Sequence, residues 1–190
     1  MHASLSHWSR RHTVILLIVL LGALLRSWAV LGLPIDSDEP TYLQAAVDYA
    51  AALRAGNLQA VIDYAGTPEH PALVKLIYGG AVLLLGGSAT QVTILYFTRA
   101  ISAFFGVLAV FVLAVVDPWA GGLLAIDTLV VKYTSQTYLE AIPLFTGLLA
   151  VLLLYRARSA SDRRFWLSGA ALGITGAGKF SYVPLVFVIL

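Results

Sequence analysis

The chain has 190 residues, of which 59% are apolar and only 12% are charged, and its mean hydropathy is +0.86. A soluble domain carries about twice that share of charge, so the composition favours an all-α, polytopic membrane protein over a soluble globule. The formal net charge is +2, and no basic tract interleaved with aromatic residues suggests a nucleic-acid partner. The chain contains no cysteine, which excludes disulfides and thiolate metal sites.

A first membrane helix is predicted over residues 13–33. Arg10, Arg11 and His12 precede it, and apolar residues continue on both sides of Arg26. A basic start followed by an apolar run is also typical of a signal peptide. However, this run reaches spanning length, and no small-residue cleavage site followed by a soluble domain appears. We therefore expect a retained membrane helix.

Residues 34–91 form the predicted outer segment, made of amphipathic helices that lie beside the membrane. It begins with Asp36, Asp38 and Glu39, three carboxylates placed where the chain leaves the first helix. Charge next to a membrane is costly and usually has a function. The apolar stretch 72–85 is too short to span, because a helix of that length reaches only about 21 Å. We expect it to lie at the outer interface.

Five further membrane helices are predicted after the outer segment. They cover residues 92–116, 119–133, 140–155, 165–178 and 180–190. No internal repeat or soluble linker divides the chain, so residues 1–190 are interpreted as a single membrane module. The last apolar run reaches the final residue, from which we expect the chain to be a piece of a larger protein.

The arginines predict the orientation. They form two basic clusters, which are Arg10 with Arg11, and Arg156, Arg158, Arg163 with Arg164. By the positive-inside rule both clusters are cytoplasmic, which requires an even number of crossings between them. Placing residues 72–85 at the interface meets this condition. The chain is thus expected in the cell membrane with a cytoplasmic N-terminus. Its extracytoplasmic face would then collect Asp36, Asp38, Glu39, Glu69, His70, Lys75, Glu140 and Lys179.

Several motifs occur in a defined order along the chain. They are Arg26-Ser27-Trp28 followed by Asp38-Glu39 and Tyr42, Glu69-His70-Pro71-Ala72-Leu73-Val74-Lys75, Arg99-Ala100-Ile101-Ser102-Ala103 with Gly106, and Tyr133 to Glu140 with Gly178-Lys179-Phe180. Together they resemble the type C membrane glycosyltransferases, which include protein O-mannosyltransferases and aminoarabinose transferases. Two positions depart from that pattern: Ala72 replaces a second proline, and Gln136 stands where the family often has arginine.

This resemblance implies an enzyme that moves a sugar from a polyprenyl-phosphate-linked donor to a protein, lipid or glycan acceptor at the extracytoplasmic face. It implies Asp38 as the catalytic base, with Glu39 orienting it or binding the acceptor. Lys75, Arg99 and Lys179 would contact the donor phosphate. The residues expected to line the site or bind the acceptor are Tyr42, Glu69, His70 and Glu140.

Plainer interpretations apply to the same residues. Acids in the first turn of a helix suit its macrodipole, and a cation near a helix end can extend to the lipid headgroups. No histidine pair at helical spacing predicts a metal centre, although Asp38 and Glu140 leave a divalent cation site open. Two other functions also stay open: a transporter or flippase, which Asp127 and Lys132 would suit, and a non-catalytic membrane scaffold.

Overall fold

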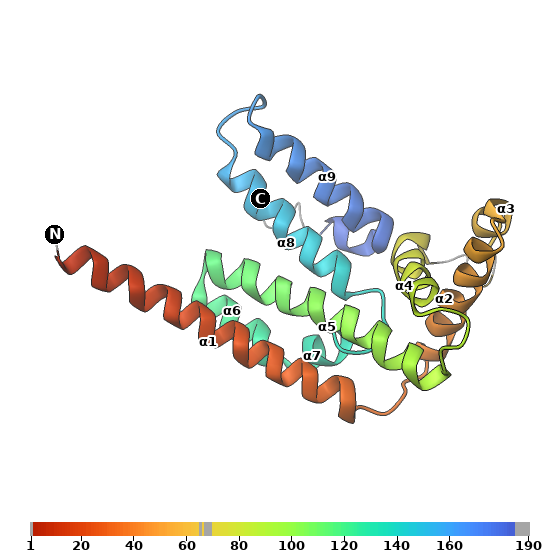
Figure 1. The fold of residues 1–190 in the computed structure, drawn as a ribbon. Coiled ribbons are helices and arrows are strands. Elements are labelled where there is room, and N and C mark those ends of the chain that lie inside the picture. Colours follow the sequence, from red (N-terminus) through yellow and green to blue (C-terminus); the bar gives the residue numbers. More distant parts are fainter. Residues whose placement is uncertain (1, 65, 67–69, 185–190) are drawn as a thin grey trace.

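The structure is a computed structural model that describes residues 2–64, 66 and 70–184. All regular structure in these residues is helical, as the composition predicts (Figure 1). The helices are α1 (His2–Gly32), α2 (Glu39–Arg54), α3 (Leu58–Ile62), α4 (Ala72–Leu85), α5 (Gln91–Val116), α6 (Pro118–Ile126), α7 (Thr128–Tyr133), α8 (Ala141–Arg156) and α9 (Arg163–Gly178), followed by the 3₁₀ turn η1 (Phe180–Tyr182).

Two long helices, α1 and α5, run antiparallel along one side of the molecule (Figure 1). Arg11 Nη2 donates to the Val115 carbonyl at 2.8 Å near one end of the pair, and Arg99 Nη1 donates to the Val30 carbonyl at 3.0 Å near the other. Among the described residues, two segments are long and apolar enough to cross a membrane, and these are Arg10–Gly32 of α1 and the whole of α5.

Both long helices expose large apolar side chains. On α1, Leu24 is 68% and Trp28 74% exposed, and on α5, Phe104 is 59% and Phe111 47% exposed. A soluble monomer rarely presents an apolar surface of this extent. The surface is the kind that lipid would cover.

The stretch 119–133, expected as one membrane helix, is two helices instead. Asp127 interrupts it with φ −60° and ψ 120°, and its carboxylate accepts a hydrogen bond from Val130 N at 2.8 Å. Asp127 thereby caps the start of α7, a role for which aspartate is well suited. Because α6 has 9 residues and α7 has 6, neither reaches spanning length alone.

Arg26 of α1 lies beside this break. Its side chain is fully buried; Nε donates to Thr134 Oγ1 at 2.9 Å and Nη1 donates to the Ala125 carbonyl at 3.4 Å. The last carbonyls of a helix have no intrahelical donor, so Arg26 satisfies part of the end of α6. Gly106 leaves room for it, because a Cβ there would meet Arg26 Nε at 2.6 Å.

A second pair, α8 and α9, packs on α5. The rings of Phe105 and Phe145 lie 5.8 Å apart between α5 and α8, and Ser168 Oγ of α9 donates to the Ala150 carbonyl of α8 at 2.7 Å. The chain turns back between α8 and α9, so this pair is antiparallel (Figure 1). The two helices agree with the predicted segments 140–155 and 165–178 to within two residues. In the predicted segment 180–190 the structure has η1, and residues 185–190 lie outside the described part.

The outer segment forms a block of three helices, α2, α3 and α4, at the end of α1 and α5 far from the N-terminus (Figure 1). Gly79 brings α4 against α2, because a Cβ there would meet Tyr49 Cβ at 2.7 Å. The core between this block, α8 and the loop before it contains Tyr42, Ala46, Ala50, Val74, Tyr78, Val82, Tyr138, Leu139 and Ile142. This core fixes the outer segment to the helix bundle.

Candidate functional site

Distant parts of the sequence meet where α1 ends, α2 begins and the α7–α8 loop passes. Asp36 Oδ2 forms an ion pair with Lys132 Nζ at 2.5 Å, and the rings of Tyr42 and Tyr138 lie 5.9 Å apart. Glu140, at the start of α8, forms an ion pair with Lys179 at the end of α9. We call this region the acid-rich end. It gathers most of the side chains that the sequence predicts for a site.

The carboxylate of Asp38 is exposed. Asp38 occupies the N-cap position of α2, yet its side chain makes no capping hydrogen bond. Ser37 Oγ approaches Asp38 Oδ1 at 3.3 Å. A carboxylate that is not committed to the helix end can accept a proton from another molecule. The geometry is therefore compatible with the base role expected from the sequence.

Arg99 is buried and every one of its N–H donors has an acceptor. Nε and Nη2 form a bidentate pair with Glu39 at 2.8 and 2.6 Å. Nη1 donates to the carbonyls of Val30 and Leu33 at 3.0 and 2.9 Å, and Nη2 also reaches the Pro34 carbonyl at 3.2 Å. A guanidinium has five donors, so none is left for a phosphate. The expected phosphate contact is replaced by a positioning role for Arg99.

Glu39 is equally committed. Its side chain is fully buried, and Oε1 also accepts a hydrogen bond from Thr137 N at 2.8 Å. Together with Arg99, Glu39 ties the end of α1, the start of α2 and the α7–α8 loop to one another. In this arrangement both Glu39 carboxylate oxygens accept hydrogen bonds from within the protein, and they hold the first turn of α2 beside Asp38.

Asp36, Lys132 and Tyr138 form a cluster that the sequence did not predict. The Lys132 ammonium, Ser37 N–H and Tyr138 hydroxyl lower the pKa of Asp36 to about 2. Burial, reinforced by the Asp36 and Asp38 carboxylates, raises the pKa of the Tyr138 hydroxyl above its usual range. The sequence could not show this cluster, because Lys132 in α7 and Tyr138 in the α7–α8 loop are separated from Asp36 by several helices along the chain.

Lys75 and His70 lie together at the start of α4. Lys75 is buried, donates from Nζ to the His70 carbonyl at 2.9 Å and lies 5.7 Å from the Tyr64 ring centroid. The His70 ring packs edge-on against Tyr42 at 5.6 Å. These three expected site residues therefore belong to one cluster, while Glu69 lies outside the described residues. Burial makes Lys75 less accessible to a phosphate than Lys179.

The Lys179–Glu140 pair is partly accessible, with the Lys179 side chain 29% exposed. Glu140 Oε1 accepts from Lys179 Nζ, whereas Glu140 Oε2 is buried and has no hydrogen-bond partner among the described residues. Buried polar atoms are seldom left unsatisfied in folded proteins. The pair thus combines a partly exposed cation with a buried carboxylate oxygen that has no hydrogen-bond partner among the described residues.

The α7–α8 loop is polar and yet buried. Ser135 and Gln136 are at most 1% exposed, and Gln136 Nε2 donates to the Pro34 carbonyl at 2.9 Å. Within the described residues, Ser135 Oγ and Gln136 Oε1 find no hydrogen-bond partner. Gln136 occupies the position where the resemblance expects arginine, and here it supports the turn between α1 and α2.

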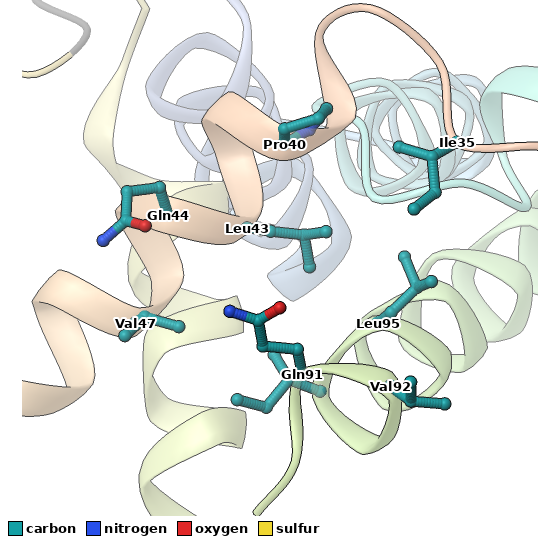
Figure 2. Close-up of a pocket in the computed structure, with 9 residues that line it drawn as sticks. Ile35, Pro40, Leu43, Gln44, Val47, Gln91, Val92 and Leu95 are labelled. Atoms are coloured by element: carbon teal, nitrogen blue, oxygen red, sulfur yellow. The ribbon is translucent and has the colours of Figure 1, made fainter.

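An apolar groove with a volume of about 330 Å³ opens between α2 and the start of α5. Its lining consists of Ile35, Pro40, Leu43, Gln44, Val47, Gln91, Val92, Ile94 and Leu95. The Gln91 side chain points from the start of α5 toward α2 (Figure 2). Because Ile35 and Val92 of its lining are more than half exposed, the groove is open to its surroundings. Sequence reasoning did not predict it.

No group of three or more histidine, aspartate or glutamate side chains suited to a metal ion occurs among the residues that the structure describes. A divalent cation between Asp38 and Glu140 therefore stays an untested expectation.

Comparisons of the chain with protein-family models, curated proteins and solved structures find no match. The resemblance to type C glycosyltransferases thus stays an expectation based on sequence motifs.

Proposed function

We propose that the chain is a membrane module whose acid-rich end binds a polyprenyl-phosphate-linked sugar and transfers the sugar to an acceptor. The observation that carries this proposal is the apolar groove, whose lining residues Ile35 and Pro40 flank the exposed carboxylate of Asp38 in the sequence. A lipid-linked donor combines a long apolar tail, an anionic phosphate and a sugar. In this proposal the groove holds the tail, Lys179 contacts the phosphate, and Asp38 lies beside the sugar, where the acceptor enters.

The proposed reaction is a direct displacement at the sugar. Asp38 accepts the proton of an acceptor hydroxyl or amine, and the acceptor atom forms a bond to the anomeric carbon. The bond between that carbon and the phosphate oxygen breaks, and its electron pair leaves with the polyprenyl phosphate. A cation beside the phosphate stabilises the charge that develops there.

Lys179 is the proposed cation. It is more exposed than Lys75, and its present partner, Glu140, is a carboxylate that a phosphate oxygen could replace. Arg99 and Glu39 act indirectly, by fixing the turn that presents Asp38. Tyr42 and His70 pack beside this turn and would line the acceptor side of the site.

The two long apolar helices support the proposed placement in the membrane, and the two arginine clusters support its orientation. With α1 and α5 spanning, the block of α2, α3 and α4 lies at the extracytoplasmic surface, and the N-terminus is cytoplasmic. In Figure 1, α4 is seen almost along its axis while α1 and α5 are seen from the side. A helix that crosses the others steeply is suited to lie along the surface, as its length of 14 residues also suggests.

The experiment is a transfer assay on the full chain in vesicles, with polyprenyl phosphates that carry a labelled hexose or pentose. We expect release of polyprenyl phosphate, and a rate loss of about 10²- to 10⁴-fold in Asp38→Asn, the usual effect of removing a general base. Asp63→Asn, an exposed carboxylate on the same outer segment, is the matched control and should keep full activity. Undiminished transfer by Asp38→Asn would remove Asp38 from the base role.

One observation favours a transporter as the second candidate. The interruption at Asp127 divides a helix into two short pieces, and the buried Arg26 lies beside it. Broken helices with charged groups at the break are typical of transporter binding sites. Uptake of labelled polyprenyl-linked sugar into vesicles, without release of polyprenyl phosphate, would favour this alternative over transfer.

A further inference from the structure

The end of the helix pair α8 and α9 that lies opposite the acid-rich end is rich in arginine. Because Glu140 begins α8 and its partner Lys179 follows α9, the loop that joins these helices must lie at the far end. This loop and its flanks, residues 156–164, hold four arginines and one aspartate. The chain's three lysines are all elsewhere, at positions 75, 132 and 179.

The single acid of this loop is occupied by the backbone. Asp162 caps α9 by accepting from Arg164 N at 2.9 Å, and its second oxygen accepts from Arg158 N at 3.2 Å. These two N–H groups hold the pKa of Asp162 below its usual value. Arg164 Nη1 also donates to the Arg156 carbonyl at 3.1 Å. The loop is therefore a closed turn with a defined shape.

The arginine side chains project from this turn. All four are exposed, and within the described residues no ion pair includes any of them. They are Arg156, Arg158, Arg163 and Arg164. Arginine binds phosphate through two parallel N–H donors, which lysine cannot do. Four exposed guanidinium groups without an acidic partner thus form a surface complementary to phosphate.

Aromatic side chains flank the same turn. Tyr155 is 84% and Trp166 is 69% exposed, and the Phe165 ring packs edge-on against Trp166 with centroids 5.8 Å apart. Exposed aromatic rings next to cations are typical of the boundary between lipid tails and headgroups. A soluble polyanion would use the arginines but not the rings. The combination favours a lipid.

We propose that the α8–α9 turn is a binding surface for the phosphate of anionic phospholipids, with Arg158, Arg163 and Arg164 as its donors. The inference rests on the membrane placement proposed above, but not on sugar transfer. A basic residue close to an anionic membrane surface contributes about 1 kcal/mol, or roughly fivefold in binding. Two or three engaged arginines predict a clear enrichment of anionic lipid around this turn.

The test uses tryptophan fluorescence of the full chain in bilayers of phosphatidylcholine and phosphatidylglycerol, in which only one of the two lipids carries bromine as a quencher. Trp166 reports on the turn when the other three tryptophans are replaced by phenylalanine. Trp28 lies near the C-terminal end of α1, away from the α8–α9 turn, and is 74% exposed. It is the matched reporter in a second single-tryptophan variant. At Trp166 we expect brominated phosphatidylglycerol to quench at least fivefold more than brominated phosphatidylcholine. At Trp28 we expect the two brominated lipids to quench equally.

The variant Arg158→Gln/Arg163→Gln/Arg164→Gln should abolish the preference at Trp166, and the corresponding triple lysine variant, which keeps the charge, should retain only part of it. Equal quenching by the two lipids at Trp166 would overturn the inference while leaving the membrane placement intact. Loss of the preference on addition of inorganic phosphate at constant ionic strength would indicate a site for free anions and would also overturn it. Absence of quenching at both tryptophans would contradict the membrane placement itself.

Discussion

At the residue scale, two buried arginines are held by the ends of helices. Arg26 donates to carbonyls at the end of α6, and Arg99 donates to carbonyls at the end of α1. The C-terminal end of a helix carries partial negative charge, so both cations lie where the backbone stabilises them. Arg99 differs because it also has a carboxylate partner, Glu39. A mutation of Glu39 therefore tests the pair directly.

Replacing Glu39 by Gln should strongly destabilise the fold. It leaves the buried Arg99 guanidinium without a counterion, a change that costs about 3–5 kcal/mol. Thermal unfolding of the purified chain in detergent measures the effect. Asp63 is exposed and follows the last residue of α3. The variant Asp63→Asn should therefore change the free energy of unfolding by no more than about 0.5 kcal/mol. Equal stability of the two variants would show that Glu39 and Arg99 are not paired.

Asp36 should make the stability of the fold depend on acid. Its pKa of about 2 lies below the ordinary value of 3.8, so the folded state favours the ionised form. The resulting stabilisation is complete above about pH 4 and is lost as the pH falls toward 2. Asp36→Asn should therefore flatten the pH dependence of unfolding in this window. In Lys132→Met, the carboxyl carbon of Asp36 should titrate closer to 3.8 by NMR, and an unchanged midpoint would contradict the ion pair.

At the element scale, contact between α2 and α4 depends on one glycine. A methyl group at Gly79 would meet Tyr49 Cβ at 2.7 Å and the Ala46 carbonyl at 3.3 Å, whereas Gly80 has nothing within 4 Å. Gly79→Ala should therefore destabilise the fold by about 1–3 kcal/mol, the usual result of overpacking. Gly80→Ala should be neutral or stabilising by up to about 1 kcal/mol, because alanine favours helix. Thermal unfolding of the two variants side by side tests the packing, and the reverse order would contradict it.

The helices themselves were largely predictable, because apolar runs and their polar ends are local signals. Residues 92–116 became α5 almost unchanged. The division of residues 119–133 at Asp127 was not predicted. The sequence does not show whether Asp127 lies inside one continuous helix or ends one helix and caps the next. At the site, Glu140 and Lys179 were expected on the same face and lie together, but their ion pair was not predicted, and the role of Asp38 stays a prediction. The commitment of Arg99 to Glu39 did not, because it depends on contacts between remote segments.

At the scale of the whole molecule, the two ends carry different chemistry. One end combines carboxylates, lysines, a buried polar loop and an apolar groove, and the other presents exposed arginines beside aromatic rings. Such an asymmetry is what the positive-inside rule produces in a membrane protein. The two proposed functions lie at different ends, with sugar transfer at the acid-rich end and phospholipid binding at the α8–α9 turn.

The central claim is that the acid-rich end forms one site on the extracytoplasmic side. The most direct test is cysteine labelling, which has no background because the chain contains no cysteine. Ser37, Ser159 and Ser181 are exposed and are replaced by cysteine one at a time in the full chain. With a membrane-impermeant maleimide on intact cells, positions 37 and 181 should be labelled and position 159 only after permeabilisation. Labelling of 37 and 181 from opposite sides, or of 37 and 159 from the same side, would contradict the account.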